Sequence, residues 1–362
     1  MNWDIKVTKN LESKIKKTDF DNLAFGKDFT DHMFIADYKD GSWTDCRIVP
    51  FEPIMMHPAA FVLHYAQSIF EGLKAELSPN NDILLFRPEE NAERFYKSAE
   101  RLAMPPIPKD LFLESIHKLI EIDHEWIPKG KANSSLYIRP FLFATDPVLG
   151  VRVGETFRYM VILGPVGSYY SAPVKVWIQD EFVRAFPGGT GEAKFAGNYA
   201  ATLQPVLEAQ KRGCAQILWT DGLTHSYFQE IGTMNIFFVI DNTILTPELN
   251  EGTILRGVTR KSLIVLAQEM GYKVEERKIT VEEFIKAVEE HRVQDMFGAG
   301  TAAVVQPISG FVYKEKEYDL TNLDREISQK LKAKLEIIKK GEIEDTHNWM
   351  YKIELNKNSQ SN

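Results

Sequence analysis

The sequence predicts a two-domain protein of mixed α/β (α+β) architecture, and three observations support that fold class. The chain has 362 residues, about the length of two domains of ordinary size. Strand-like and helix-like apolar patterns alternate along most of it. A Gly- and Pro-rich stretch separates two such regions, which predicts an N-terminal domain over 1–165, a linker over 166–173 and a C-terminal domain over 174–362.

The first domain is expected to begin with a hairpin, because the turn-like sequence Lys39-Asp40-Gly41-Ser42 separates two β-rich runs. Further on, Pro88 follows a buried-type strand and suits the first turn of a helix, where a missing N–H costs little. The predicted elements are strands over 33–38, 43–49 and 83–86, helices from Pro88 and over 111–126, and strands over 136–143 and 159–163.

The same alternation continues after the linker. Gly213 is placed to end a helix, because Gly readily adopts the left-handed conformation found just beyond helix ends. The predicted elements are a strand over 174–178, a Gly-rich loop over 187–191, a helix over 198–211, strands over 216–219 and 235–240, and helices over 258–270 and 280–291. The polar first twenty and last ten residues are expected to be the least ordered.

The composition argues against several functional classes. With 43 basic and 51 acidic residues, the net charge of −8 does not favour nucleic-acid binding. No stretch has the roughly 18 uncharged apolar residues of a membrane span, and the N-terminus has no apolar signal-peptide core. Cys46 and Cys214 are the only cysteines, so a reduced, cytoplasmic setting is the simplest interpretation.

Some familiar ligand sites are also not predicted. In the Gly-rich segment 188–194, Ala193 stands where a phosphate-binding P-loop requires Gly, and Phe195 stands where it requires Ser or Thr. The segment 298–303 lacks the acidic residue that accompanies a dinucleotide fingerprint. The histidines are scattered and form no His-x-x-x-His pair, so we expect no zinc site.

Lys194 is the strongest candidate for covalent chemistry. Glycines precede it and Gly197 follows it, so a bulky ligand can approach the backbone closely. A Lys amine among apolar groups loses its proton more readily and becomes a nucleophile toward aldehydes. That is the chemistry of a Schiff base with pyridoxal phosphate. For a lone Lys in a Gly-rich loop, simple exposure to solvent is the commoner case.

Three further features could complete a site for such a cofactor. Glu230 enters an apolar strand, and a buried carboxylate needs a partner such as a protonated pyridine nitrogen. Gly257 precedes an apolar-periodic helix whose first N–H groups suit a phosphate. Arg87, at a strand end, could clamp the phosphate. Taken singly, a loop Glu, an ordinary N-cap and a surface Arg are the simpler interpretations.

These features belong to a set of segments, in family order over about residues 25–310, that resembles the branched-chain amino-acid aminotransferases, which are class IV pyridoxal-phosphate enzymes. The resemblance implies that family's fold, with a smaller N-terminal α/β domain and a larger C-terminal domain with a barrel-like sheet. The segments are Tyr65-x4-Phe70-Glu71-Gly72-Leu73-Lys74, Leu85-Phe86-Arg87-Pro88, Ser135-Leu136-Tyr137-Ile138-Arg139-Pro140, Arg184-Ala185, Gly188-Gly189-Thr190-Gly191, Lys194-x2-Gly197-Asn198-Tyr199, Glu230-x-Gly232-Thr233-Met234-Asn235, Gly257-Val258-Thr259-Arg260 and Phe297-Gly298-Ala299-Gly300-Thr301-Ala302.

The resemblance implies a role for each matching residue. Lys194 would form the Schiff base and shuttle a proton, Glu230 would keep the pyridine nitrogen protonated, and Tyr199 would bond to the ring hydroxyl. The phosphate would be held by Arg87, Val258, Thr259 and Thr301. The substrate pocket would be shaped by Phe25, Tyr65, Phe70, Tyr137, Arg139, Tyr169, Thr233 and Ala302. Arg139 and the tyrosines are the candidates for holding a glutamate side chain.

The implied activity is transamination of leucine, isoleucine and valine, with 2-oxoglutarate and glutamate as the other pair, in a homodimer with each site at the subunit interface. A D-amino-acid transaminase or an aminodeoxychorismate lyase is the nearest alternative, because both share the Lys and the Glu. A non-catalytic small-molecule-binding protein is the alternative from another class. Ala303 and Gln306 stand where some animal members have a redox Cys-x-x-Cys, which favours a bacterial cytoplasmic enzyme.

Overall fold

The computed structural model describes residues 3–131, 134–167 and 172–355, which fall into two compact units. Unit 1 comprises Met1–Tyr169, Ala193–Ala196 and Ile337–Asn362, and unit 2 comprises Tyr170–Glu192 and Gly197–Glu336. Two segments that follow the expected linker therefore fold with unit 1, and one of them contains Lys194. The predicted limits of the linker stay a prediction, because residues 168–171 lie outside the described residues.

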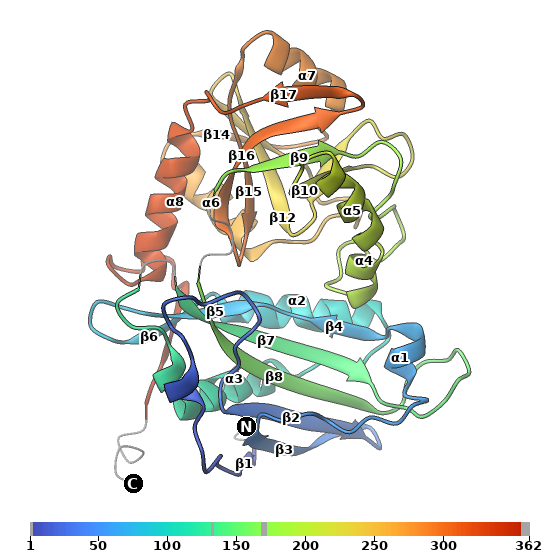
Figure 1. The fold of residues 1–362 in the computed structure, drawn as a ribbon, viewed down its shortest axis with the longest axis vertical. Helices are drawn as coiled ribbons and strands as arrows, with labels where there is room; N and C mark the ends of the chain where they lie inside the picture. The colour runs from blue at the N-terminus through green and yellow to red at the C-terminus, as the bar shows by residue number, and fades with distance from the viewer. Residues whose placement is uncertain (1–2, 132–133, 168–171, 356–362) are drawn as a thin grey trace. The chain divides into compact units, whose positions relative to one another are not determined.

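Unit 1 is built on a nine-stranded sheet in which the long antiparallel strands β7 and β8 lie side by side (Figure 1). The strand order is β1 (Lys6–Val7), β3 (Ser42–Pro50), β2 (His32–Lys39), β8 (Phe157–Val166), β7 (Ser135–Ala144), β5 (Leu73–Leu77), β6 (Ile83–Phe86) and β18 (Met350–Ile353), with β4 (Ser68–Phe70) paired to β7. The pairing of β18 with β6 explains why the C-terminal segment belongs to this unit.

The predicted β2–β3 hairpin is confirmed. Asp40 and Gly41 form its turn with φ angles of 52° and 81°, the left-handed pair that matches the natural twist of a two-residue hairpin.

Helices α2 (Pro88–Arg101) and α3 (Lys109–Asp123) pack with the strands of unit 1 around one apolar core. The ring of Phe95 on α2 lies 5.6 Å from that of Phe112 on α3 and 5.9 Å from that of Tyr159 on β8. Pro88 is the first residue of its helix, as predicted. The predicted helix over 111–126 is α3 followed by a 3₁₀ turn, His124–Trp126, while the short α1 (Phe61–Tyr65) was not predicted.

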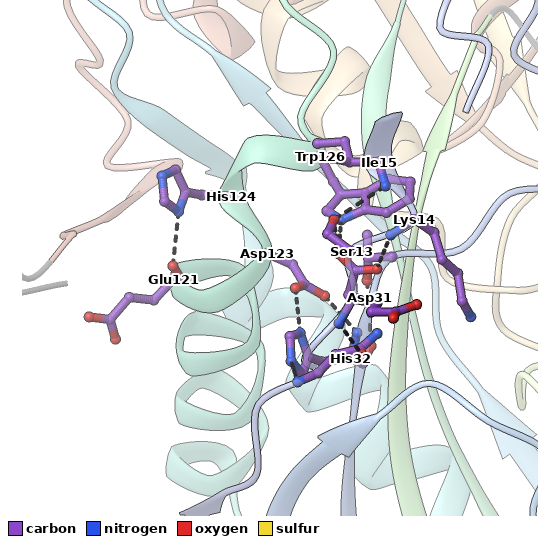
Figure 2. A network of polar contacts seen from close by, with 12 residues as sticks. Ser13, Lys14, Ile15, Asp31, His32, Glu121, Asp123, His124 and Trp126 are labelled. Atoms are coloured by element: carbon purple, nitrogen blue, oxygen red, sulfur yellow. Dashed lines mark hydrogen bonds and ion pairs between the residues drawn. The ribbon is translucent and has the colours of Figure 1, made fainter. Parts of the chain in front are cut away.

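The N-terminal segment is held by buried polar contacts at the start of β2, although the sequence suggested little order there (Figure 2). Asp31 accepts hydrogen bonds from the Ser13 hydroxyl at 2.6 Å and from the Trp126 indole at 2.9 Å. His32 Nδ1 lies 2.7 Å from Asp123 Oδ1 at the end of α3. Two adjacent residues thus join the N-terminal segment, β2 and the end of α3.

Unit 2 contains the expected barrel-like sheet. Six strands form a closed ring, because β11 pairs with β10 on one side and with β12 on the other. In ring order they are β11 (Phe228–Ile231), β10 (Gln216–Thr220), β9 (Val174–Ile178), β16 (Val304–Tyr313), β15 (Val293–Gly300) and β12 (Met234–Ile240). The remaining strands of this sheet are β13 (Thr243–Thr246), β14 (Lys273–Glu276) and β17 (Lys316–Asp319).

The predicted continuous helix over 198–211 is wrong, because the chain forms α4 (Ala196–Ala200) and then α5 (Leu203–Lys211). Pro205 gives the physical reason: it has no N–H to donate to the carbonyl of residue 201, and its ring would collide with that carbonyl. The predicted helices over 258–270 and 280–291 are confirmed as α6 (Val258–Glu269) and α7 (Val281–Glu289), and α8 spans Glu326–Lys339. Among the described residues, no helix is long and apolar enough to cross a membrane.

Candidate active site

Lys194 belongs to unit 1, where its backbone is held on both sides. Its amide donates a hydrogen bond to Ser98 Oγ on α2 at 3.0 Å. Its carbonyl accepts a hydrogen bond from the Phe70 amide at the end of β4, also at 3.0 Å. The next residue, Phe195, forms an isolated β-bridge with Ile69. The backbone of Lys194 is therefore hydrogen-bonded to both α2 and β4.

Four predicted substrate-pocket residues lie together in unit 1, close to Lys194. The Lys194 amine is 4.8 Å from the centre of the Phe70 ring. The Arg139 guanidinium lies 4.8 Å from the centre of the same ring and donates to the Tyr137 hydroxyl at 2.9 Å. Phe25 packs edge-on against Tyr137 with ring centres 4.8 Å apart. Aromatic walls and one cation thus surround the end of β4.

A buried carboxylate that the sequence argument did not single out lies beside this group. Glu71 is fully buried and bonded to Arg94 through both oxygens, at 2.6 Å and 2.8 Å. Asn91 also donates to it, at 2.8 Å. Burial by itself would raise the pKa of Glu71, but Arg94, the Lys194 amine and Asn91 outweigh burial and lower the pKa. Glu71 is therefore ionised at neutral pH.

Gly72 is required by the close approach of Tyr137. A Cβ atom at position 72 would overlap the Tyr137 hydroxyl, so any larger residue would displace that side chain. The Phe-Glu-Gly segment of the sequence thus contributes a ring, a buried charge and a space for Tyr137. These three functions account for its residue types.

Arg87 and Tyr65 are the other described residues of unit 1 that were predicted for the site. Arg87 is buried at the N-cap of α2, 2.8 Å from Glu90, with a φ of 48°. A left-handed non-glycine residue is strained, and such strain concentrates at functional sites. Tyr65 ends α1, where its hydroxyl donates to the Leu149 carbonyl. Tyr169 lies outside the described residues.

Glu230, in unit 2, has a partner within the chain that the sequence argument did not consider. Its Oε1 lies 2.9 Å from Nε of Arg184, and both side chains are almost fully buried. Its Oε2 accepts a hydrogen bond from the Leu255 amide at 2.9 Å. Arg184 and the Leu255 amide thus fix both oxygens of the buried carboxylate in place.

The first turn of α6, a candidate phosphate site, lies close to the same cluster. Gly257 is the N-cap residue and supplies no side-chain cap, and a Cβ there would overlap Asn235 Oδ1. Asn235 Nδ2 donates to the Leu255 carbonyl at 2.9 Å. Val258 and Thr259 follow and are buried. The backbone N–H groups of a first helical turn, together with a Thr hydroxyl, form a donor set that suits a phosphate.

Two turns place three more predicted residues at one end of the barrel. Thr233 lies in the turn between β11 and β12, and Thr301 and Ala302 lie in the turn between β15 and β16. Because β12 and β15 are antiparallel neighbours with Asn235 opposite Ala299, both turns lie at the same edge of the sheet.

Tyr199 is half-buried on α4, beside a residue that fixes the Gly-rich loop. Asn198 donates to the Thr190 carbonyl and accepts from the Thr190 hydroxyl, both at 2.7 Å. These two bonds tie loop 187–191 to the start of α4, which carries Tyr199.

Comparisons with known proteins identify the family to which the chain belongs. The family model described as Amino-transferase class IV matches residues 68–311. Branched-chain-amino-acid aminotransferase 2 of Bacillus subtilis (strain 168) is 45% identical over 346 residues, covering 94% of this chain and 95% of the relative. The branched-chain-amino-acid aminotransferase of Mycolicibacterium smegmatis is 44% identical over 341 residues, covering 92% of each.

Solved structures show the same fold. The Escherichia coli branched-chain amino acid aminotransferase superimposes with a TM-score of 0.73 at 23% identity, covering 90% of this chain and 99% of the other. The branched-chain amino acid aminotransferase of Thermobaculum terrenum in its PLP-form has a TM-score of 0.72 at 19% identity, covering 91% of this chain and 100% of the other. With its family match, its barrel unit and its clusters around Lys194 and Glu230, this chain belongs to the class IV aminotransferases.

Proposed function

We propose that this protein is a branched-chain-amino-acid transaminase that depends on pyridoxal phosphate. It transfers the amino group of L-leucine, L-isoleucine or L-valine to 2-oxoglutarate. The central observation is Lys194, whose amine lies 4.8 Å from the Phe70 ring while its backbone is bonded on both sides. The relatives at 44–45% identity carry the branched-chain name, which favours this activity over a D-amino-acid transaminase or an aminodeoxychorismate lyase.

The donor and acceptor groups of the chain fit the cofactor. Lys194 offers an amine for its aldehyde carbon, and Glu230 offers a buried carboxylate for its ring nitrogen. Tyr199 is assigned to the ring hydroxyl. The phosphate is assigned to Arg87, Val258, Thr259 and Thr301. When bound, pyridoxal phosphate supplies an electron-withdrawing ring that acidifies the Cα–H of the amino acid.

Lys194 and Glu230 have different roles in the proposed reaction. Lys194 binds the cofactor and moves the proton of the substrate Cα, which requires an amine that can lose its own proton. Arg184, 2.9 Å from Glu230, holds that carboxylate in place, and the carboxylate would keep a proton on the ring nitrogen of the cofactor.

Substrate selection is assigned to the aromatic group of unit 1. Phe25, Phe70 and Tyr137 provide apolar walls for a branched side chain, and the Arg139 guanidinium between two of these rings provides charge for the glutamate side chain. Ala302 is assigned to the substrate carboxylate end. Thr233, Tyr65 and Tyr169 remain proposed pocket residues.

The decisive test is replacement of Lys194. We expect the wild type to bind pyridoxal phosphate with the visible absorbance of a lysine-bound cofactor, and to prefer L-branched-chain donors in a panel of L- and D-amino acids. Lys194→Ala should lose that absorbance and lower turnover by several orders of magnitude. Lys97→Ala, which removes an exposed Lys of α2, is the control and should behave as the wild type. Near-normal turnover of Lys194→Ala would overturn the proposal.

We also propose a homodimer. Leu149, Val151 and Val153, in the loop between β7 and β8, are 61%, 81% and 58% exposed in the single chain. Three neighbouring exposed apolar side chains are typical of an interface. Light scattering should give twice the chain mass, and Val151→Asp should shift it toward the monomer. Leu11→Asp, at an exposed apolar residue elsewhere in unit 1, is the control and should leave the dimer intact.

A cytoplasmic location is proposed as well. Cys46 and Cys214 are both free and buried, which is compatible with a reducing compartment. Cell fractionation with compartment markers tests this assignment.

A further inference from the structure

We propose that helix α2 positions Lys194 through the hydroxyl of Ser98, which accepts a hydrogen bond from the Lys194 amide. The inference rests on the proposed function of Lys194 and deepens it. Ser98 is a positioning residue, because it bonds to the backbone of Lys194 and not to the reacting amine.

One face of α2 carries three polar residues, and each of them forms a hydrogen bond with Glu71 or Lys194. Asn91, Arg94 and Ser98 are separated by three and four positions, so they lie on one side of the helix. Asn91 and Arg94 donate to the carboxylate of Glu71, and Ser98 accepts from the Lys194 amide. A polar stripe on this otherwise core-facing side of the helix needs a reason beyond apolar packing.

The contacts close into a ring. Ser98 accepts from the Lys194 amide, and the Lys194 carbonyl accepts from the Phe70 amide. Phe70 is bonded through the chain to Glu71, and Glu71 is held by Arg94 on the same helix as Ser98. Every link lies within unit 1, so Lys194 and the Phe70 ring are fixed to a single helix.

Burial makes these links hard to replace. Ser98 is 1% exposed and Glu71 is 0% exposed, so water does not reach either group to substitute for a lost partner. The segment that needs the support is also short: only Ala193–Ala196 belongs to unit 1, and the chain on both sides belongs to unit 2. Because only four residues of this segment belong to unit 1, each hydrogen bond that joins them to that unit matters for their position.

The expected consequence is a loss of rate. Misplacing a catalytic group by about 1 Å can cost on the order of a hundredfold in rate. Ser98→Ala removes the acceptor for the Lys194 amide, and we expect kcat to fall about tenfold to a hundredfold while KM changes much less.

The matched control is Ser115→Ala. Ser115 is also a fully buried serine of a unit 1 helix, and its hydroxyl bonds to the Phe112 carbonyl at 2.9 Å and to Tyr159 at 3.1 Å. The substitution removes the same atom from the same core without touching Lys194. We expect its kcat to stay within about twofold of the wild type. An equal loss of kcat in both variants would overturn the proposal in favour of general destabilisation.

A second readout does not depend on activity. In the cofactor-free protein, hydrogen exchange resolved to single residues should show faster exchange of the Lys194 amide in Ser98→Ala and no change in Ser115→Ala. Unchanged exchange together with wild-type kcat would overturn the proposal.

If Ser98→Ala does not fold, Ser98→Cys provides the same test. Its side chain has the same connectivity with a larger atom in place of the hydroxyl oxygen, and sulfur is a weak acceptor, so kcat should fall and Lys194 exchange should rise as well. Wild-type values for both would overturn the proposal. Failure of the proposed function looks different: the wild type would lack lysine-bound cofactor, or Lys194→Ala would retain turnover, whatever the Ser98 variants do.

Discussion

At the scale of single residues, the pair of Glu230 and Arg184 decides how the carboxylate behaves. The sequence indicated that a buried Glu230 needs a positive partner, and the structure places Arg184 2.9 Å from it. Arg184 also donates to the Thr253 carbonyl at 3.0 Å, so its position does not depend on the ion pair alone. The position of the carboxylate is therefore set by Arg184 and by the Leu255 amide, both from this chain.

We predict that Glu230→Gln binds pyridoxal phosphate but turns over more slowly, because a neutral amide favours the protonated ring nitrogen less. A hydrogen bond to a charged group contributes about 1.5–3 kcal/mol, which corresponds to about one to two orders of magnitude in kcat. Steady-state kinetics and the visible spectrum measure the two effects.

The control for this substitution is Glu276→Gln, which removes the carboxylate that lies 2.7 Å from the buried Arg260 of the same unit. It should leave kcat near the wild-type value. If Glu230→Gln also kept normal kinetics with an intact spectrum, Glu230 would be a structural residue.

At the scale of elements, one buried carboxylate, that of Asp31, joins three segments. It connects the N-terminal segment and the residues that follow α3 to the start of β2. Burial by itself would raise the pKa of Asp31, but the hydrogen bonds from the Lys14 amide, the Ser13 hydroxyl and the Trp126 indole outweigh it and lower the pKa. His32 beside it accepts from the Asn10 amide at Nε2, so its proton resides on Nδ1 and is donated to Asp123 (Figure 2).

We predict that this junction is lost in acid. Because the pKa of Asp31 is lower in the folded protein than the ordinary value of 3.8, its contribution to stability is complete above that pH and decreases as the pH falls below it. Asp31→Asn should lower the free energy of unfolding by about 1.5–3 kcal/mol at pH 7 and by less at pH 3.

Urea unfolding of both proteins at the two pH values provides the measurement. Asp40→Asn, at an exposed residue of the β2–β3 turn, serves as the control. A difference between wild type and Asp31→Asn that is equally large at pH 3 would show that the charge of Asp31 is not the source of the stabilisation.

At the scale of the whole molecule, the two cysteines bear on how the enzyme responds to oxidation. Burial raises the pKa of Cys46 to about 11 and that of Cys214 to about 11. One lies in unit 1 and the other in unit 2, and they are 5% and 1% exposed. Because the thiolate is the form that reacts with peroxide, both thiols are protected by their raised pKa. Their burial also limits the access of peroxide.

We predict that mild peroxide changes transaminase activity little. Activity is assayed before peroxide, after it and after dithiothreitol, while thiol titration of native and denatured protein reports whether the two side chains stay reduced. A large loss of activity that dithiothreitol restores would identify one of them as a redox switch.

The sequence by itself determined much of the local structure and the identity of the key residues. Apolar patterns predicted the β2–β3 hairpin, β9 and the helices α2, α6 and α7. A strand or helix that buries one face carries apolar residues at a regular spacing along the sequence. Lys194, Glu230 and Arg87 were singled out by residue type and neighbourhood, and the order of motifs pointed to the family. Apolar periodicity did not reveal β4, β5, β15 or β16. The strands β4 and β5 have only three and five residues, and β15 and β16 bury consecutive side chains on both faces, which hides the period of two.

Only the tertiary structure decided which residues meet. Nothing local to Lys194 indicates that Ser98 and Phe70 hold its backbone, that Arg184 balances Glu230, or that four residues around Lys194 fold with unit 1. The physical reason is that hydrogen bonds and ion pairs between distant segments depend on how whole sheets and helices pack, whereas a sequence pattern records only whether each residue is buried. The break between α4 and α5 is the reverse case, because a single residue, Pro205, excludes the continuous helix that the pattern favoured.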